Sequence, residues 1–132
     1  MVNPLLLLAA GVANIVLGMI WYNPRVFGTA WMRMSNITPE QAERGKKRMW
    51  LSSIVAFLAA MWLAWVMSFV FAAFGVYEAS GALDVSFWLW AGIAAPLMLG
   101  SVLWEAKPFR LFLINAGYWL VAFVVIGLVL VA

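Results

Sequence analysis

The sequence contains no cysteine and no histidine, and only 10% of its 132 residues are charged. Without cysteine no disulfide can form, and the two side chains that bind transition metals best are both absent. Catalytic systems built on a histidine base or a cysteine nucleophile are also excluded. Cysteine usage therefore says nothing about the redox compartment, and we expect no metal or other cofactor.

Apolar side chains are abundant instead. Hydrophobic residues make up 67% of the chain, whereas a soluble domain is about half apolar and about a quarter charged. Four apolar runs are long enough to cross a hydrocarbon layer of ~30 Å at about 1.5 Å per residue. The predicted spans are about residues 5–22, 49–74, 85–104 and 109–131. The predicted fold is therefore an all-α integral membrane protein, with four transmembrane helices bundled into a single domain over residues 1–132.

The first apolar run is interpreted as a membrane span and not as a cleaved signal peptide. No Lys or Arg precedes it, whereas a signal peptide needs a basic segment at its start. Pro24 lacks an amide hydrogen and disfavours helix at Asn23, so the span is expected to end there. Trp21 and Tyr22 lie where an interfacial aromatic belt is typical.

Between the first two spans, apolar and polar residues are interleaved, which is typical of a short amphipathic segment lying in the membrane surface. Thr38, Pro39 and Gln41 then form a helix-start signature: an N-cap, a proline at the first helical position and a glutamine three residues after the cap. From this signature we predict one long helix from Thr38 to Phe74, solvated in its first turns and embedded in the membrane from Met49 onward.

The apolar part of this predicted helix has two unlike faces. Small residues recur at every fourth position, which favours close packing of helix backbones: Ser52, Ala56, Ala60, Ala64, Ser68 and Ala72. Bulky residues lie roughly opposite: Leu58, Trp62, Trp65 and Phe69. The bulky face has two interpretations. It contacts lipid or a partner protein, or it is an aromatic wall that binds a lipid tail, a quinone or a carotenoid.

The connection to the third span is short and has no basic residue, and Asp84 or Ser86 is the expected N-cap of the next helix. Pro96 removes one hydrogen bond from the helical ladder, so we predict a kink there. A tight turn at Glu105–Pro108 leads to the last span, and Arg110 near its start can reach the headgroups.

The basic residues are distributed asymmetrically. All eight lie in the first and third connections or at their edges: Arg25, Arg33, Arg44, Lys46, Lys47, Arg48, Lys107 and Arg110. The positive-inside rule therefore predicts that both termini are outside a bacterial cytoplasmic (inner) membrane and that both basic connections face the cytoplasm. The dense group at residues 44–48 sets this topology, binds anionic lipid headgroups or docks a partner. Nucleic acid is not an expected partner, because the basic strip lies against the bilayer.

Few side chains could carry chemistry. The acidic residues are all predicted at or beyond the membrane interfaces: Glu40, Glu43, Glu78, Asp84 and Glu105. No two of them are paired within the membrane, so intramembrane acid–base chemistry has no obvious carrier. The sequence also lacks a glycine-rich phosphate loop. We predict that the protein is not an enzyme.

Three polar residues inside the spans are candidate contacts: Asn14, Asn115 and Tyr118. A rise of about 1.5 Å per residue puts Asn14 about 12 Å from Tyr22, and Tyr118 about 13 Å from Phe109. Because these depths are similar, Asn14 and Tyr118 can form a hydrogen bond between helices. The alternative interpretation is that the polar residues line a path for a substrate or an ion.

Two separated segments carry a family resemblance. The first reads Trp21-Tyr22-Asn23-Pro24, then Phe27-Gly28 and Trp31, and the second is Phe112-Leu113-Ile114-Asn115-Ala116-Gly117-Tyr118. Together they resemble a bacterial family catalogued as domain of unknown function seventeen sixty-one. The resemblance covers the whole chain and implies a small four-span membrane protein. It implies no catalytic residue, because none is established for that family.

These observations predict a structural or accessory membrane subunit that makes helix–helix contacts with itself or with another membrane protein. One alternative is a small homo-oligomeric channel or transporter, with Asn14, Asn115 and Tyr118 near the path. The other alternative is a binder of a lipid, a quinone or a carotenoid, with the bulky face of the long helix as its binding surface.

Overall fold

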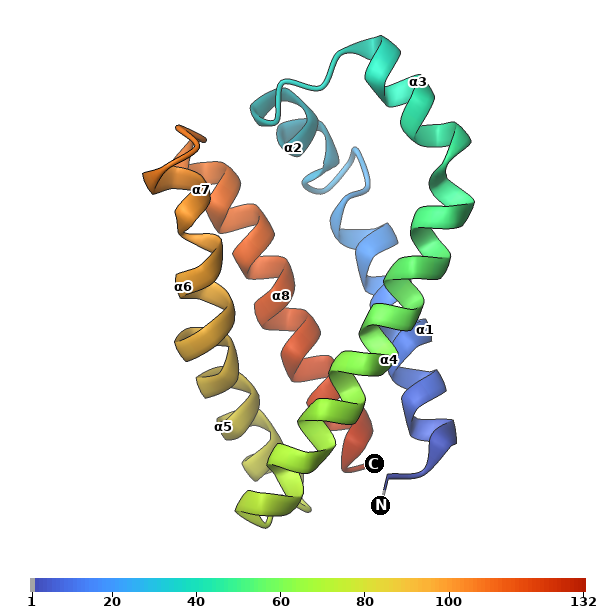
Figure 1. The fold of residues 1–132 in the computed structure, drawn as a ribbon, viewed down its shortest axis with the longest axis vertical. Helices are drawn as coiled ribbons and strands as arrows, with labels where there is room; N and C mark the ends of the chain where they lie inside the picture. Colours follow the sequence, from blue (N-terminus) through green and yellow to red (C-terminus); the bar gives the residue numbers. More distant parts are fainter. Residues whose placement is uncertain (1) are drawn as a thin grey trace.

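The structure, a computed structural model, describes residues 2–132 (Figure 1). Three spans are single helices: α1 (Pro4–Trp21), α4 (Met49–Phe74) and α8 (Phe109–Leu130). The third span is built from α5 (Ala79–Leu89), a π-helical turn η1 (Trp90–Ala94), α6 (Ala95–Met98) and α7 (Gly100–Leu103). Two short helices, α2 (Gly28–Met34) and α3 (Pro39–Lys47), join the first two spans. The predicted all-α fold with four apolar spans is confirmed, and the chain is a multi-pass membrane protein.

Helix α8 contacts each of the other three spans. It packs against α1 on one side and against the third span on the other, while α4 lies mainly across α1 (Figure 1). The two termini and the α4–α5 connection lie at one end of the molecule, which we call the terminal end. Helices α2 and α3 and the α7–α8 turn lie at the opposite end. Because these elements and their flanks hold every basic residue, we call it the basic end.

The prediction of one continuous helix from Thr38 to Phe74 is wrong. Helical geometry is interrupted at Arg48, where φ is −102° and ψ is 3°, so α3 and α4 are separate helices. The predicted capping box of α3 is confirmed: Gln41 N donates to Thr38 Oγ1, and Thr38 N donates to Gln41 Oε1. Helix α3 has no buried residue, so no packing against the rest of the chain keeps it collinear with α4.

Helix α4 ends in a Schellman motif. Gly75 adopts a left-handed conformation with φ of 66°, which a side chain would disfavour. The Gly75 N–H donates to Ala72 O at 3.2 Å, and the Val76 N–H donates to Phe71 O at 2.8 Å. Val76 is buried in the core, so the motif both closes α4 and turns the chain toward α5.

The third span begins at Ala79, before the predicted start at Val85. Asp84 and Ser86, which were the predicted N-caps, lie inside α5, and Glu78 precedes the helix without a capping hydrogen bond from its side chain. The prediction was wrong because it took the charge-free run as the helix itself. Ala82 is fully buried in the first turns of α5, so packing supports helix there despite the exposed carboxylate at Asp84.

A kink was predicted at Pro96, and the structure has a π-helical turn directly before this residue, at Trp90–Ala94. In this turn the Ala95 N–H donates to Trp90 O, five residues back. Proline has no amide hydrogen, and its ring presses on the carbonyl four residues earlier, which is that of Gly92. A local change of helical pitch is one way in which a helix accommodates this conflict.

The apolar core lies toward the terminal end. Its buried members come from α1, α4, α5 and α8 and from the α4–α5 connection: Ala10, Ala64, Met67, Phe71, Val76, Ala82, Phe123 and Ile126. Only the middle of the predicted small-residue face is buried, at Ala60 and Ala64, whereas Ser52 and Ala72 at its ends are exposed. The packed stripe of α4 therefore passes from small residues to the larger Met67 and Phe71.

Helices α5 and α8 approach each other closely at Gly127. A Cβ atom added there would collide with Ser86 Oγ and would lie 3.2 Å from Phe71 Cζ. Ser86 is fully buried, and among residues 2–132 its hydroxyl has no hydrogen-bond partner. The absence of a side chain at Gly127 is thus a packing requirement, since its backbone is ordinary α-helix.

Gly127→Ala is therefore expected to lower the stability of the protein in detergent by about 1–3 kcal/mol, the usual cost of overpacking a core. Thermal unfolding followed by circular dichroism would measure the change. Gly92→Ala is the matched control, because no atom lies within 4 Å of a Cβ at that position. Equal losses in the two variants would contradict the close approach of α5 and α8.

Candidate functional site

The hydrogen bonds that join side chains of different spans converge on one stretch of α8, residues Ile114–Tyr118, which we call the α8 polar segment. Two indole N–H groups donate to its backbone carbonyls: Trp21 Nε1 to Ile114 O at 3.0 Å, and Trp90 Nε1 to Ala116 O at 2.8 Å. Two tyrosine hydroxyls complete the set, those of Tyr22 and Tyr118. The α8 polar segment thus connects α8 to α1 on one side and to the third span on the other.

Asn14 and Tyr118 form the most buried of these contacts. Tyr118 Oη donates to Asn14 Oδ1 at 2.5 Å and also lies 3.1 Å from the Asn14 carbonyl oxygen. Gly18, one turn further along α1, lies beside the phenol, since a Cβ there would be 3.4 Å from Tyr118 Oη. The structure therefore brings together the two residues whose similar depth suggested a contact.

Asn115, the third candidate, does not join that pair. Its Oδ1 accepts a hydrogen bond from Tyr22 Oη at 2.8 Å. The rings of Tyr22 and Tyr118 lie 5.4 Å apart, so the two contacts are neighbours. The sequence did not predict Tyr22 as the partner of Asn115, because Tyr22 was interpreted only as part of an interfacial aromatic belt. Its position directly after the first span was the only available signal.

The turn after α1 explains how Trp21 and Tyr22 are directed toward α8. The Phe27 N–H donates back to Trp21 O at 3.1 Å, and the two rings pack with their centroids 4.7 Å apart. The Gly28 N–H donates to Asn23 O at 2.9 Å, and a Cβ at Gly28 would collide with the carbonyl oxygen of Tyr22. This tight turn fixes the end of α1, and Gly28 is the residue that permits it.

The four bulky residues of α4 form an exposed aromatic ridge, the name used below for Leu58, Trp62, Trp65 and Phe69. Their exposed fractions are 57%, 66%, 38% and 56%, respectively. Trp62 and Trp65 have ring centroids 5.2 Å apart, and those of Trp65 and Phe69 are 4.7 Å apart. The ridge is therefore a continuous aromatic surface on the outside of the molecule, separate from the α8 polar segment.

The basic cluster lies at the basic end, on α3 and the residue that follows it. All four members are exposed: Arg44, Lys46, Lys47 and Arg48. Lys46 Nζ lies 3.4 Å from Glu43 Oε1 one turn away, and an exposed pair of this kind adds little to stability. The cluster is exposed and therefore open to an anionic partner. Within residues 2–132 its side-chain hydrogen bond is to Glu43, and none joins it to the α8 polar segment.

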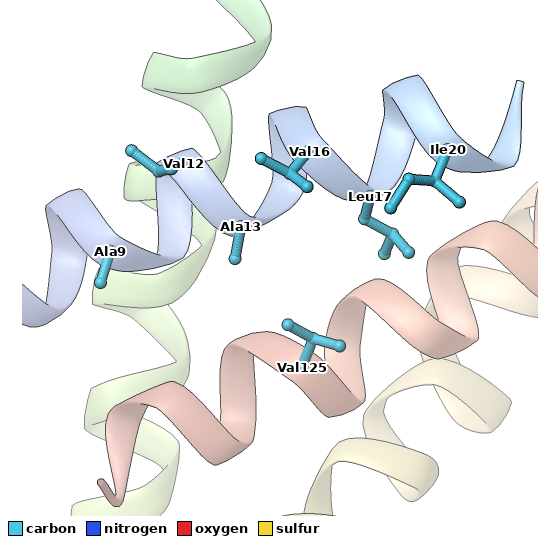
Figure 2. Close-up of a pocket in the computed structure, with 7 residues that line it drawn as sticks. All are labelled: Ala9, Val12, Ala13, Val16, Leu17, Ile20 and Val125. Atoms are coloured by element: carbon cyan, nitrogen blue, oxygen red, sulfur yellow. The ribbon is translucent and has the colours of Figure 1, made fainter. Parts of the chain in front are cut away.

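Two of the hollows on the surface of residues 2–132 differ in the polarity of their lining. The larger, about 570 Å³, lies between α1 and α8, and Figure 2 shows Leu17 and Val125 facing each other across it. Its lining is entirely apolar: Ala9, Val12, Ala13, Val16, Leu17, Ile20 and Val125. The smaller, about 230 Å³, lies between α6, α7, the turn after α7 and α8, and is lined in part by polar residues. Across residues 2–132 no three acidic side chains gather into a group that could hold a metal ion.

The Asn14–Tyr118 contact can be tested with a double-mutant cycle of Asn14→Leu and Tyr118→Phe. Each single change should lower the thermal stability in detergent. Tyr118→Phe leaves the buried Asn14 Oδ1 without its donor, and Asn14→Leu leaves the Tyr118 hydroxyl only the backbone carbonyl of residue 14. The coupling energy is expected to be about 0.6 kcal/mol and at most ~1.7 kcal/mol, as for other hydrogen bonds between membrane helices.

Tyr77→Phe is the control for this cycle, because Tyr77 is 75% exposed and forms no hydrogen bond among the described residues. It should leave the melting temperature unchanged. Strictly additive losses in the Asn14→Leu/Tyr118→Phe double variant would show that the two side chains do not interact.

Comparison with known proteins identifies the family. Neither the curated proteins nor the solved structures include a match to this chain. The model of the family described as "Protein of unknown function (DUF1761)" matches residues 5–131, nearly the whole chain. The match includes both segments that meet at the α8 polar segment, residues 21–31 and 112–118. The chain therefore belongs to the DUF1761 family.

Proposed function

We propose that this protein is a non-enzymatic accessory subunit of the membrane, which makes helix–helix contacts with itself or with another membrane protein. One observation carries the proposal: the indoles and tyrosine hydroxyls at the α8 polar segment form hydrogen bonds within the chain, while long apolar faces stay open. In the most apolar stretch of the third span only 6% of the residues are buried, against 33% in α8. The chain thus has exposed apolar surface for contacts with other proteins and few side chains that could carry out catalysis.

The polar contacts support a packing role over a transport path. The Tyr118 hydroxyl and the Trp21 and Trp90 indoles all donate to acceptors within the chain. A path needs polar groups that remain available to a passing ion or substrate. The larger hollow, beside α1, has no polar residue in its lining. A channel built from several copies is therefore the weaker proposal.

The aromatic ridge supports one second candidate, a protein that binds a lipid tail, a quinone or a carotenoid. Centroid separations of 4.7 and 5.2 Å place the rings of Trp62, Trp65 and Phe69 in one exposed row, with adjacent planes inclined by 74° and 43°. Such a row suits a long acyl chain or a conjugated molecule, because aromatic contacts add specific attraction to simple burial.

We also propose the bacterial inner membrane as the location, with the basic end in the cytoplasm and both termini outside. The support is the placement of the charges. The connections that hold all eight basic residues lie at one end of the molecule, opposite the termini (Figure 1). Under the positive-inside rule such a separation sets the orientation of a multi-span protein.

A photo-crosslinking amino acid in place of Trp62 would test the accessory-subunit proposal in native membranes. We expect one discrete protein adduct, whose mass identifies a second copy or a partner. The same probe in place of Met67, which is 2% exposed, should give no adduct between chains. If the probe at position 62 captures only lipid or a pigment, the accessory-subunit proposal fails and the second candidate takes its place.

The orientation can be tested with single cysteines, because the chain has no native cysteine. Ser80→Cys, at the start of α5, should react in intact cells with a thiol reagent that cannot cross the membrane. Gly45→Cys, on α3, should react only after the cells are opened, and its side chain has open space around it. The reverse pattern would invert the proposed orientation.

A further inference from the structure

We propose that the smaller hollow, at the basic end, is a binding site for a primary ammonium group, such as that of an ethanolamine lipid headgroup or of a small free amine. Its six lining residues come from the end of the third span, the turn after it and the first turns of α8: Leu97, Met98, Ser101, Glu105, Phe112 and Asn115. This inference does not rest on the proposed role as an accessory subunit.

Charge is the first reason for the assignment. Glu105 is the only charged residue that lines the hollow, and within residues 2–132 it forms no ion pair. Ser101 Oγ donates its hydrogen to Met98 O at 3.0 Å, so the lone pairs of this oxygen remain as acceptors. The ring of Phe112 adds a π face, to which a cation is also attracted. Acceptors and negative charge thus outweigh donors, which suits an ammonium group.

Other ions fit the lining less well. A Ca²⁺ or Mg²⁺ ion takes about six to eight oxygen ligands, of which carboxylates are the strongest, and this hollow has one carboxylate. Glu105 would repel a phosphate or carboxylate inside the hollow, because Lys107 and Arg110 do not line it. The volume of about 230 Å³ is below the usual range for drug-sized ligands, about 300–1,000 Å³, so the occupant is a small group or the head of a larger molecule.

Asn115 provides a complementary donor. Its Oδ1 accepts the hydrogen bond from Tyr22 Oη. The two hydrogens on its amide nitrogen remain available as donors. They match an oxygen close to the ammonium group, such as a phosphate or hydroxyl oxygen. Lys107 and Arg110 follow Glu105 in the same turn and the first turn of α8. A zwitterionic headgroup held by Glu105 would thus find positive charge nearby for its phosphate.

The turn that contains Glu105 has an unusual backbone conformation. Ala106 adopts a left-handed conformation with φ of 54°, which is unusual for a residue with a side chain. The next residue closes the turn, since the Lys107 N–H donates to Ser101 O at 3.0 Å. Strained backbone of this kind tends to occur at ligand-binding positions. Here it directly follows Glu105, which lines the same hollow as Phe112 and Asn115 of α8.

Native mass spectrometry of the full chain in detergent would test the proposal. Wild-type protein, titrated with short-chain phosphatidylethanolamine, should bind it about two- to fivefold more tightly than Glu105→Gln protein does, because an ion pair with an exposed carboxylate is lost. Phosphatidylcholine should bind the wild type more weakly than phosphatidylethanolamine, since its trimethylated nitrogen has no hydrogen to donate. Ser101→Ala should cause a smaller loss of phosphatidylethanolamine affinity.

Glu40→Gln is the matched control, because it removes an exposed carboxylate from the same end of the molecule. It should bind phosphatidylethanolamine as the wild type does. Melting temperatures of all variants exclude loss of folding as the cause. A further arm uses soluble ethanolamine. Displacement of the lipid by ethanolamine assigns the site to free amines, and failure to displace assigns it to the lipid. Equal binding of both lipids, or unchanged binding in Glu105→Gln, would overturn the proposal.

Discussion

Inside a bilayer a polar group has no water to bond to, so the protein itself must provide its partner. In this chain the partners are concentrated on a few residues of α8. A helical carbonyl already accepts one bond in the ladder, but its oxygen has a second lone pair. The indoles of Trp21 and Trp90 use that capacity at Ile114 and Ala116. Neighbours on both sides of α8 are thus held without any break in its backbone hydrogen bonding.

Because the polar contacts are concentrated on α8, the two halves of the molecule are stabilised by different kinds of interaction. Toward the terminal end the contacts are apolar, and they depend on close fit because lipid tails are as apolar as the side chains they would replace. Ala64, Ala82 and Gly127 allow that fit. Closer to the basic end, Asn14 and Asn115 bond to tyrosine hydroxyls instead. Directional bonds there fix the rotation of α1 about its axis relative to α8.

The sequence was sufficient to predict the properties that depend only on position along a helix axis. Long apolar runs placed the four spans, and the rise of a helix placed Asn14 and Tyr118 at matching depths. Properties that depend on rotation or tilt were not accessible. Hydrogen bonding by Tyr22 required the direction of its side chain, which the tight turn at Gly28 fixes. The early start of α5 was missed because hydropathy reports preference for lipid, and a helix can extend beyond the lipid. The break at Arg48 was missed because a capping signature predicts where a helix starts and not where it ends.

The contacts also separate the first of the two family segments, residues 21–31, from the residues available for function. Trp21, Tyr22 and Gly28, which carried the resemblance, are engaged in turn formation and in bonds to α8. Those hydrogen bonds stabilise the fold. The polar groups of Trp21 and Tyr22 are therefore already used and have little capacity left to bind a ligand. The unused capacity is elsewhere, in the aromatic ridge of α4 and around Glu105. A search for function that begins from the first family segment would therefore examine residues that stabilise the fold. The second segment is different, because its Phe112 and Asn115 also line the hollow beside Glu105.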